Sequence, residues 1–285
     1  MRIAERAHAK INWALNIVGR RGDGYHLLDM VMQSIALGDD MAFEDAAALT
    51  LKVNGRPDPE PERNLVMKAA RALQGYTGTR RGAAISLKKN VPTRAGLGGG
   101  SADCALTLRA LDRLWGLELS DEELLQLGAR LGADVPFCLT GGLARVRGIG
   151  ERLDPIPAGD PIPLTLVTPG GGLSTAEVFG LFDRGGYVPV SLDAQALADA
   201  VTRRDLPAID ALAVNALTAP AVALMPEIAE TMARLRAAGA RAVLMTGSGS
   251  TVVGAFDAME QAQQAAQTLH GAIVTATCGE TDTLN

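Results

Sequence analysis

A cluster of glycines between residues 96 and 101 is the clearest chemical signal in this sequence. Four of these six residues are glycine, in the order Gly-Leu-Gly-Gly-Gly-Ser. A short strand is expected before the cluster and a helix after it. Glycines let the backbone approach an anion, successive N–H groups form a concave nest, and a helix N-terminus adds partial positive charge. The pattern therefore favours a phosphate-binding loop, with a flexible linker or tight helix packing as the structural alternative.

This loop differs from two well-known nucleotide-binding patterns, and two other glycine-rich segments are ambiguous. No G-x-x-x-x-G-K-[ST] sequence is present, and Ser101 takes the third glycine position of G-x-G-x-x-G. Residues 246–251 read Thr-Gly-Ser-Gly-Ser-Thr between two strand-like runs, where a plain hairpin turn would serve as well. In the Gly-Gly-Gly-Leu-Ser-Thr segment at 170–175, Ser174 or Thr175 is suited to cap a following helix.

Asp134 and Lys10 are candidates for acid–base chemistry. Asp134 lies between apolar neighbours and shortly before a proline, a setting that suits a partly buried general base. A turn or helix-terminal aspartate is the simpler interpretation of this fragment alone. Lys10 shares one face of a predicted strand with Asn12, because apolar residues alternate with polar or small ones from position 11 to 17. A single lysine on such a face is ordinarily solvated.

The histidines and cysteines give weaker signals. Tyr25 and His26 end a glycine-punctuated loop, where they could stack on or bond to a ligand, or simply lie on the surface. His8 and His270 have no metal-ligand spacing to Asp, Glu or Cys, so we expect no structural metal site. The cysteines at positions 104, 138 and 278 form no C-x-x-C pair, which favours reduced thiols over a disulfide framework.

Hydrophobic periodicity predicts the elements that must position these residues. In the first half we expect a half-buried strand at 11–17, a helix at 64–73, a strand at 85–89, a helix directly after the glycine cluster, and a further helix that begins at a capping box formed by Ser120 and Glu123. In the second half we expect strands at 164–168, 242–246, 252–256 and 272–276, and helices at 193–214, 227–238 and 258–269. This β-α-β-β-α-β order is typical of a ferredoxin-like unit.

Composition bounds the remaining possibilities. The chain has 285 residues, of which 47% are hydrophobic and 21% charged, which suggests about two globular domains. A Gly- and Pro-rich stretch at 148–163 places their boundary near residue 160. The net charge of −5 and the aromatic content of 4% argue against a nucleic-acid binder. No apolar run reaches the length of a membrane span, and no signal peptide is visible, so we expect a cytoplasmic protein. Separately, we expect a monomer or a homodimer.

Taken together, the motifs resemble the GHMP kinase superfamily, whose central signature is P-x-x-x-G-L-G-[SG]-S-[SA]. Residues 92–102 here read Pro-Thr-Arg-Ala-Gly-Leu-Gly-Gly-Gly-Ser-Ala. Within the superfamily the match is closer to the branch that phosphorylates 4-diphosphocytidyl-2-C-methyl-D-erythritol. That closer match lies in Ala-Lys-Ile-Asn at 9–12, Asp-Gly-Tyr-His at 23–26, Arg-Asn-Leu at 63–65 and Gly-Ala-Asp-Val-Pro-Phe at 132–137. The similarity spans nearly the whole chain.

The resemblance implies an α+β fold of two domains with the active site between them. Residues 1–159 would form the ATP-binding domain, similar to the second domain of ribosomal protein S5, and residues 160–285 a ferredoxin-like domain. The implied reaction is phosphoryl transfer from ATP, with Mg²⁺, to the C2 hydroxyl of the cytidyl substrate in the non-mevalonate isoprenoid pathway.

Residue roles follow from the same resemblance. Asp134 would take the proton of the attacking hydroxyl, and Lys10 would hold Asp134 ionised and orient the hydroxyl. Residues that would bind ATP are Pro92, Thr93, Arg94, Ala95, Gly96, Leu97, Gly98, Gly99, Gly100, Ser101, Ala102, Asn64 and Leu65. Residues that would contact the acceptor are Asn12, Tyr25, His26, Thr175, Phe179, Gly247 and Ser248. Among these, Tyr25 and Phe179 would stack on cytosine and His26 would hydrogen-bond to it.

Two positions depart from the family pattern, and two other functions stay open. Arg94 stands where a glycine is usual, so the loop entry differs or the guanidinium reaches a phosphate. Ala102 replaces a serine whose hydroxyl helps to place Mg²⁺ in relatives, so the metal ligands stay unassigned. The alternatives are a related kinase acting on homoserine or mevalonate, and a nucleotide-binding regulator without activity. The Asp-Gly-Tyr-His segment argues against the first, and the intact Lys10 and Asp134 against the second.

Overall fold

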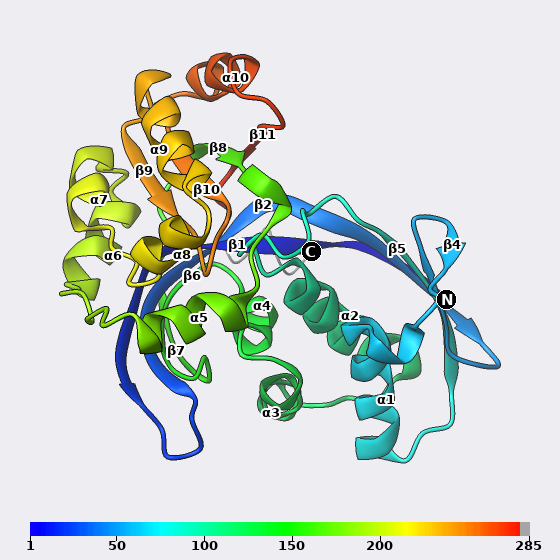
Figure 1. Cartoon of the computed structure of the whole chain (residues 1–285). Coiled ribbons are helices and arrows are strands. Elements are labelled where there is room, and N and C mark those ends of the chain that lie inside the picture. The colour runs from blue at the N-terminus through cyan, green and yellow to red at the C-terminus, as the bar shows by residue number, and fades with distance from the viewer. Residues whose placement is uncertain (280–285) are drawn as a thin grey trace.

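Two long antiparallel strands, β1 (Arg2–Arg20) and β2 (His26–Ala46), organise the first half of the chain. The computed structural model describes residues 1–279. The two strands extend across the molecule and are strongly curved (Figure 1). Five shorter strands complete the sheet in the order β4-β3-β5-β2-β6-β7, with β1 paired to β2. They are β3 (Thr50–Val53), β4 (Arg56–Pro57), β5 (Gly82–Lys88), β6 (Leu143–Gly148) and β7 (Arg152–Ile156).

The strand predicted at 11–17 is part of β1, but the expectation of a half-buried strand is wrong. The polar side chains of Lys10, Asn12 and Asn16 are buried along with the apolar ones. Both faces are covered because backbone loops from the two halves of the chain pack against this part of β1. The register with β2 also shifts between Asn12 and Ala14, so the strict alternation of faces is interrupted there.

Four helices lie together under the curve of the β1–β2 pair (Figure 1). They are α1 (Leu65–Thr77), α2 (Gly99–Trp115), α3 (Asp121–Leu131) and α4 (Val135–Thr140), with a 3-10 turn η1 (Pro61–Arg63) before α1. The capping box predicted at Ser120 and Glu123 is present at the start of α3. As predicted, α2 directly follows the glycine cluster, and its apolar side packs against β1 and β2.

The second half forms a four-stranded antiparallel sheet in the order β11-β8-β10-β9. Its strands are β8 (Pro163–Val167), β9 (Ala242–Met245), β10 (Val252–Ala255) and β11 (Ile273–Ala276). A β-α-β-β-α-β chain with this strand order is the ferredoxin-like arrangement that the sequence predicts. A 3-10 turn η2 (Pro169–Gly171) follows β8, and the helices are α5 (Thr175–Arg184), α6 (Ala194–Thr202), α7 (Leu206–Leu212), α8 (Thr218–Leu224), α9 (Glu227–Ala237) and α10 (Met259–Gln267).

The helical pattern predicted over 193–214 is divided between two helices, α6 and α7. Arg204 adopts a left-handed backbone with φ 55°, which ends the first helix. The side chain of Asp205 then accepts a hydrogen bond from the Ala208 N–H and caps the second helix. The periodicity continues across this break, so hydrophobic spacing alone does not reveal it.

The two sheets share one hydrophobic cluster. Ile11 and Trp13 of β1 pack in the same cluster as Leu164 of β8 and Leu244 of β9. The Leu37 N–H of β2 donates a hydrogen bond to Thr275 Oγ1 of β11 at 2.9 Å. The chain passes from one sheet to the other after β7, and we keep residues 159 and 160 as the proposed boundary between the domains. No helix within residues 1–279 has the length and apolar character needed to cross a membrane.

Candidate active site

The glycine cluster and the 246–251 loop pack directly against each other. A Cβ atom on Gly96 would lie 2.4 Å from the carbonyl oxygen of Thr246, and one on Gly247 would lie 2.8 Å from the carbonyl oxygen of Gly96. Both glycines also have positive φ, 78° and 59°. Only glycine allows this approach. The 246–251 loop does connect two strands, as a hairpin turn would, and it also forms part of the contact between the two halves of the chain.

Strand β1 anchors both loops. The Lys10 N–H donates to the carbonyl oxygen of Leu97 at 3.0 Å, and the Asn12 N–H donates to Thr246 Oγ1 at 2.8 Å. The two loops are therefore fixed on neighbouring positions of one strand. Gly98, with φ 69°, precedes the first residue of α2, so the turn that enters the helix lies directly above Lys10.

Lys10 and Asp134 form an ion pair at this junction. The Lys10 ammonium lies 3.3 Å from Asp134 Oδ2, and it donates to Asn12 Oδ1 at 2.8 Å and to the Gly96 carbonyl at 3.0 Å. The Lys10 side chain is 4% exposed, whereas that of Asp134, at the N-terminus of α4, is 31% exposed. The expectation of a solvated lysine is wrong, because the glycine loop covers it. Asp134 thus presents a carboxylate beside a fixed positive charge.

A cavity of about 1310 Å³ opens at this ion pair. Such a volume exceeds the roughly 300–1,000 Å³ of an ordinary ligand pocket and could hold two ligands. Both halves of the chain line it, and most of the residues predicted from the sequence are present: Lys10, Asn12, Asn64, Leu65, all of 92–101, Asp134, Thr175, Phe179, Gly247 and Ser248. Ala102 is not among the lining residues, because its side chain is buried on the inner side of α2.

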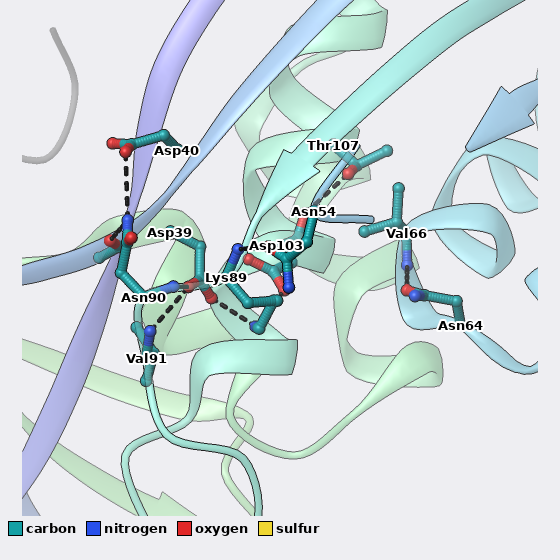
Figure 2. A network of polar contacts seen from close by, with 11 residues as sticks. Asp39, Asp40, Asn54, Asn64, Val66, Lys89, Asn90, Val91, Asp103 and Thr107 are labelled. Atoms are coloured by element: carbon teal, nitrogen blue, oxygen red, sulfur yellow. Dashed lines mark hydrogen bonds and ion pairs between the residues drawn. The ribbon is translucent and has the colours of Figure 1, made fainter. Parts of the chain in front are cut away.

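A buried network of two carboxylates and one ammonium lies at the edge of this cavity (Figure 2). Lys89, which follows β5, contacts Asp39 of β2 and donates to Asp103 Oδ2 of α2 at 2.8 Å. Asp39 Oδ1 also accepts from the backbone N–H groups of Asn90 and Val91, at 2.5 and 2.8 Å. These bonds fix the segment that leads into the glycine cluster.

Asp103 is the member of this network whose hydrogen bonding is incomplete. Its Oδ1 atom is buried and has no hydrogen-bond partner among residues 1–279. Burial raises the pKa of Asp103 to about 7, with Lys89 opposing and Asp39 adding to the shift. Burial lowers the pKa of Lys89, but the two carboxylates outweigh that effect and raise it. Asp103 and Lys89 were missed by sequence reasoning. The available signal was a charged residue in the first turn of α2, on the side that carries the buried apolar residues.

Two of the predicted base-binding residues, His26 and Phe179, lie together where the β1–β2 hairpin meets α5. The His26 ring lies with its centroid 4.7 Å from that of Phe179, and His26 Nε2 is 2.7 Å from Asp183 Oδ1. Tyr25 is 61% exposed, with the Arg21 guanidinium 5.6 Å from its ring centroid. Phe179 lines the cavity, whereas Tyr25 and His26 lie beyond its lining.

Two contacts connect α5 to the glycine loops. Thr175 Oγ1 and Ser248 Oγ are 2.8 Å apart and share a hydrogen bond. Of the two helix caps predicted, Ser174 and Thr175, it is Ser174 that caps α5, by accepting a hydrogen bond from the Glu177 N–H. The Leu173 N–H donates to the carbonyl oxygen of Arg94 at 3.2 Å. The start of α5 is therefore fixed to both loops.

Comparisons with known proteins agree with this architecture. The family model described as GHMP kinases N terminal domain matches residues 64–142, and that described as GHMP kinases C terminal matches residues 197–272. A 4-diphosphocytidyl-2-C-methyl-D-erythritol kinase of Pelotomaculum thermopropionicum is 46% identical, covering 93% of both chains. The enzyme of the same name from a Geobacillus species is 41% identical over 89% of this chain and 88% of its own.

Solved structures extend the comparison. A crystal structure of 4-(cytidine 5'-diphospho)-2C-methyl-D-erythritol kinase superposes with a TM-score of 0.84 at 35% identity, covering 97% of this chain and all of its own. The homoserine kinase of Cytophaga hutchinsonii, at 18% identity and a TM-score of 0.73 over 98% of this chain and 95% of its own, shares the fold. From its sequence identity to these relatives, the chain belongs to the GHMP kinases and, within them, to the family of 4-diphosphocytidyl-2-C-methyl-D-erythritol kinases.

Proposed function

We propose that this protein transfers the γ-phosphoryl group of ATP to the C2 hydroxyl of 4-diphosphocytidyl-2-C-methyl-D-erythritol, a step of the non-mevalonate isoprenoid pathway. The observation that carries the proposal is the Asp134 carboxylate, which lies 3.3 Å from the buried Lys10 ammonium beside a glycine loop, in a cavity large enough for two ligands. The family relationship supplies the identity of the acceptor.

In this mechanism Asp134 is the general base. Its carboxylate accepts the proton of the C2 hydroxyl while the hydroxyl oxygen bonds to the γ-phosphorus and the bond from that phosphorus to the β,γ-bridging oxygen breaks. ADP leaves and the 2-phosphate remains. Lys10 stabilises the ionised carboxylate, since opposite charges this close attract strongly in a buried setting. Its ammonium also lies where it can orient the hydroxyl.

The glycine cluster would hold the phosphates of ATP. Backbone N–H groups at the start of α2 present partial positive charge to the cavity. Asn64 and Leu65 line the same cavity and would border the adenine. Most of the catalytic effect would then come from positioning and charge stabilisation, as in other phosphoryl transfers.

Mg²⁺ is the expected companion of ATP. No group of three His, Cys, Asp or Glu side chains within residues 1–279 is arranged as a metal site. Mg²⁺ bound with ATP needs only one or two protein oxygen ligands besides phosphate and water, so the residues present fit it. Ser101 lines the cavity next to the loop and would hold the ion, which would neutralise phosphate charge.

The acceptor would lie across the other end of the cavity. Phe179 would stack on the cytosine, with Tyr25 on its other face and His26 as a hydrogen-bonding partner. Asn12, Thr175, Gly247 and Ser248 would contact the rest of the molecule. Because ATP is the donor, we expect the enzyme to act in the cytoplasm.

ADP release in the presence of Mg²⁺ and ATP tests this function. 4-Diphosphocytidyl-2-C-methyl-D-erythritol, homoserine and mevalonate are offered in parallel. We expect turnover with the cytidyl substrate alone. Turnover with another alcohol would retain a kinase but refute the cytosine site. Binding of ATP without turnover on any of the three would favour the regulator instead.

A further inference from the structure

Arg94 combines an unusual backbone with a place on the cavity wall. Its φ is 56°, a left-handed backbone conformation that residues other than glycine rarely adopt. The surroundings impose it, because the Arg94 carbonyl accepts the Leu173 N–H at 3.2 Å and a Cβ on Gly172 would lie 2.4 Å from that same carbonyl oxygen. An unfavourable backbone kept at a non-glycine residue in a ligand cavity is a recognised sign of function.

Charge pairing singles out the same residue. Among the cations that line the cavity, Lys10 is paired with Asp134, and Lys89 with Asp39 and Asp103. Within residues 1–279, Arg94 and Arg56 have neither an ion pair nor a side-chain hydrogen bond. Arg56 belongs to β4, in the same segment as Asp58, which bonds to Asn64 at the proposed nucleotide end. Arg94 is therefore the available cation at the end of the cavity formed by α5.

A cation at this end would be complementary to the diphosphate of the acceptor. If cytosine stacks on Phe179 and the hydroxyl meets Asp134, the diphosphate between them must cross the wall formed by Thr175, Ser248 and Arg94. Thr175 and Ser248 offer hydroxyl groups that already bond to each other at 2.8 Å. Two hydroxyls cannot neutralise a diphosphate. A guanidinium can, because its planar donors match phosphate oxygens two at a time.

We propose that the Arg94 side chain binds the diphosphate of the acceptor substrate and is a specificity determinant of this enzyme. The assignment rests on the proposed function. The backbone of Arg94 remains part of the loop proposed for ATP, but its guanidinium faces the acceptor and leaves the ATP phosphates to the glycine N–H groups.

The variant Arg94→Gly separates this role from folding. Glycine accepts φ 56° without strain, so the variant should be at least as stable as the wild type, with an unchanged or higher Tm. A charge-assisted hydrogen bond is worth roughly a factor of 10 to 100 in affinity. We therefore expect the KM for the acceptor to rise at least about tenfold, with the KM for ATP and kcat within about twofold of wild type. Arg94→Lys keeps the positive charge but loses the paired, planar N–H donors of the guanidinium. Its KM for the acceptor should lie between those of the wild type and Arg94→Gly.

Arg204→Gly is the matched control, because Arg204 has φ 55° and lies outside the cavity. It makes the same substitution on the same backbone conformation and should leave both KM values unchanged.

Inhibition by CDP and by cytidine measures the diphosphate contact directly. In the wild type CDP should inhibit competitively against the acceptor at least about tenfold better than cytidine, and Arg94→Gly should nearly abolish that preference. An equal preference in both proteins, or an effect confined to the KM for ATP or to kcat, would overturn the assignment while leaving the proposed function intact. Failure of the wild type to phosphorylate the acceptor would overturn both.

Discussion

The roles proposed for Lys10 and Asp134 differ because the two side chains are buried to different degrees. The Lys10 ammonium is covered and donates to Asn12 Oδ1 and the Gly96 carbonyl, which leaves one of its three hydrogens toward Asp134. Asp134 retains oxygen atoms on the cavity side, so a substrate hydroxyl can reach it. In the proposed mechanism the lysine therefore acts mainly on the carboxylate, and the carboxylate acts on the substrate.

Replacing Asp134 tests the base directly. Asp134→Asn keeps the side chain's size but cannot accept the hydroxyl proton, so kcat should fall by roughly 10²- to 10⁴-fold. ATP affinity, measured by calorimetry, should stay near wild type because the glycine loop is untouched. Asp154→Asn, at an exposed carboxylate on β7, is the control and should keep full activity. A near-normal kcat in Asp134→Asn would exclude this aspartate as the base.

A second prediction at the level of one residue concerns Asp103 and the pH dependence of the protein's stability. Its pKa is near 7 in the folded protein against 3.8 ordinarily, so the folded state holds a proton that the unfolded state releases between these values. The contribution of Asp103 to the free energy of unfolding therefore falls as the pH rises from about 4 to 7, and it is constant above pH 7. Asp103→Asn removes this loss. The Tm of the variant relative to wild type should rise across that window and then level off.

The control for this experiment is Asp40→Asn. Asp40 lies next to Asp39, but hydrogen bonds from Arg6 and Asn90 hold its pKa below the ordinary value. Its contribution is present at higher pH and is lost in acid, the opposite direction. A flat difference curve for Asp103→Asn would mean that Asp103 is ionised throughout the window.

At the level of elements, the contact between the two glycine loops fixes the position of the loop that is proposed to bind ATP. Strand β1 anchors one loop through Leu97 and the other through Thr246. The loops then meet at Gly96 and Gly247, with no room for a side chain on either. Backbone packing this close leaves little room for one loop to move independently of the other.

Gly96→Ala tests that contact. Its Cβ would lie 2.4 Å from the backbone oxygen of Thr246, on top of the cost of a positive φ, so we expect a loss of about 2–5 kcal/mol in unfolding free energy and weaker ATP binding. Gly78→Ala is the matched control. Gly78 has φ 73° and open space around it, so only the backbone cost of about 1 kcal/mol applies. Equal losses in the two variants, by urea denaturation, would show that the loops have room to separate.

At the level of the whole molecule, the two sheets share their core. Apolar residues of β1 and β2 belong to the same cluster as residues of β8, β9 and β10. β11 also packs against β2, through the hydrogen bond from Leu37 to Thr275. The active-site cavity lies on this shared structure, so its two walls should not move apart without exposing core.

The intact chain should therefore unfold in a single transition. Calorimetry should show one peak, with a ratio of calorimetric to van't Hoff enthalpy of about 1. Mg²⁺ and ATP should shift that peak to higher temperature as a whole, since a ligand bound only by the folded state stabilises it by mass action. Two resolved peaks, or a shift of only one of them, would show that the halves fold independently.

Local signals in the sequence were enough to determine most of the elements and several parts of the site. The alternation around Lys10 predicted that it shares a face with Asn12, the capping box predicted the start of α3, and the β-α-β-β-α-β order predicted the second sheet. These features depend on residues close together in the chain. The family motifs added the pairing of Lys10 with Asp134, which spacing alone left open.

Only the tertiary structure decided the rest. Burial of Lys10, the split of the 193–214 helix at Arg204, and the network of Lys89, Asp39 and Asp103 were not predicted. Lys89 and Asp39 are 50 positions apart, and Asn12 and Thr246 are 234 apart. Such contacts depend on strand register and on how the two sheets pack, which hydrophobic periodicity does not encode. For the same reason, the sequence identified Arg94 as unusual, but only the fold placed it beside α5 on the wall of the cavity.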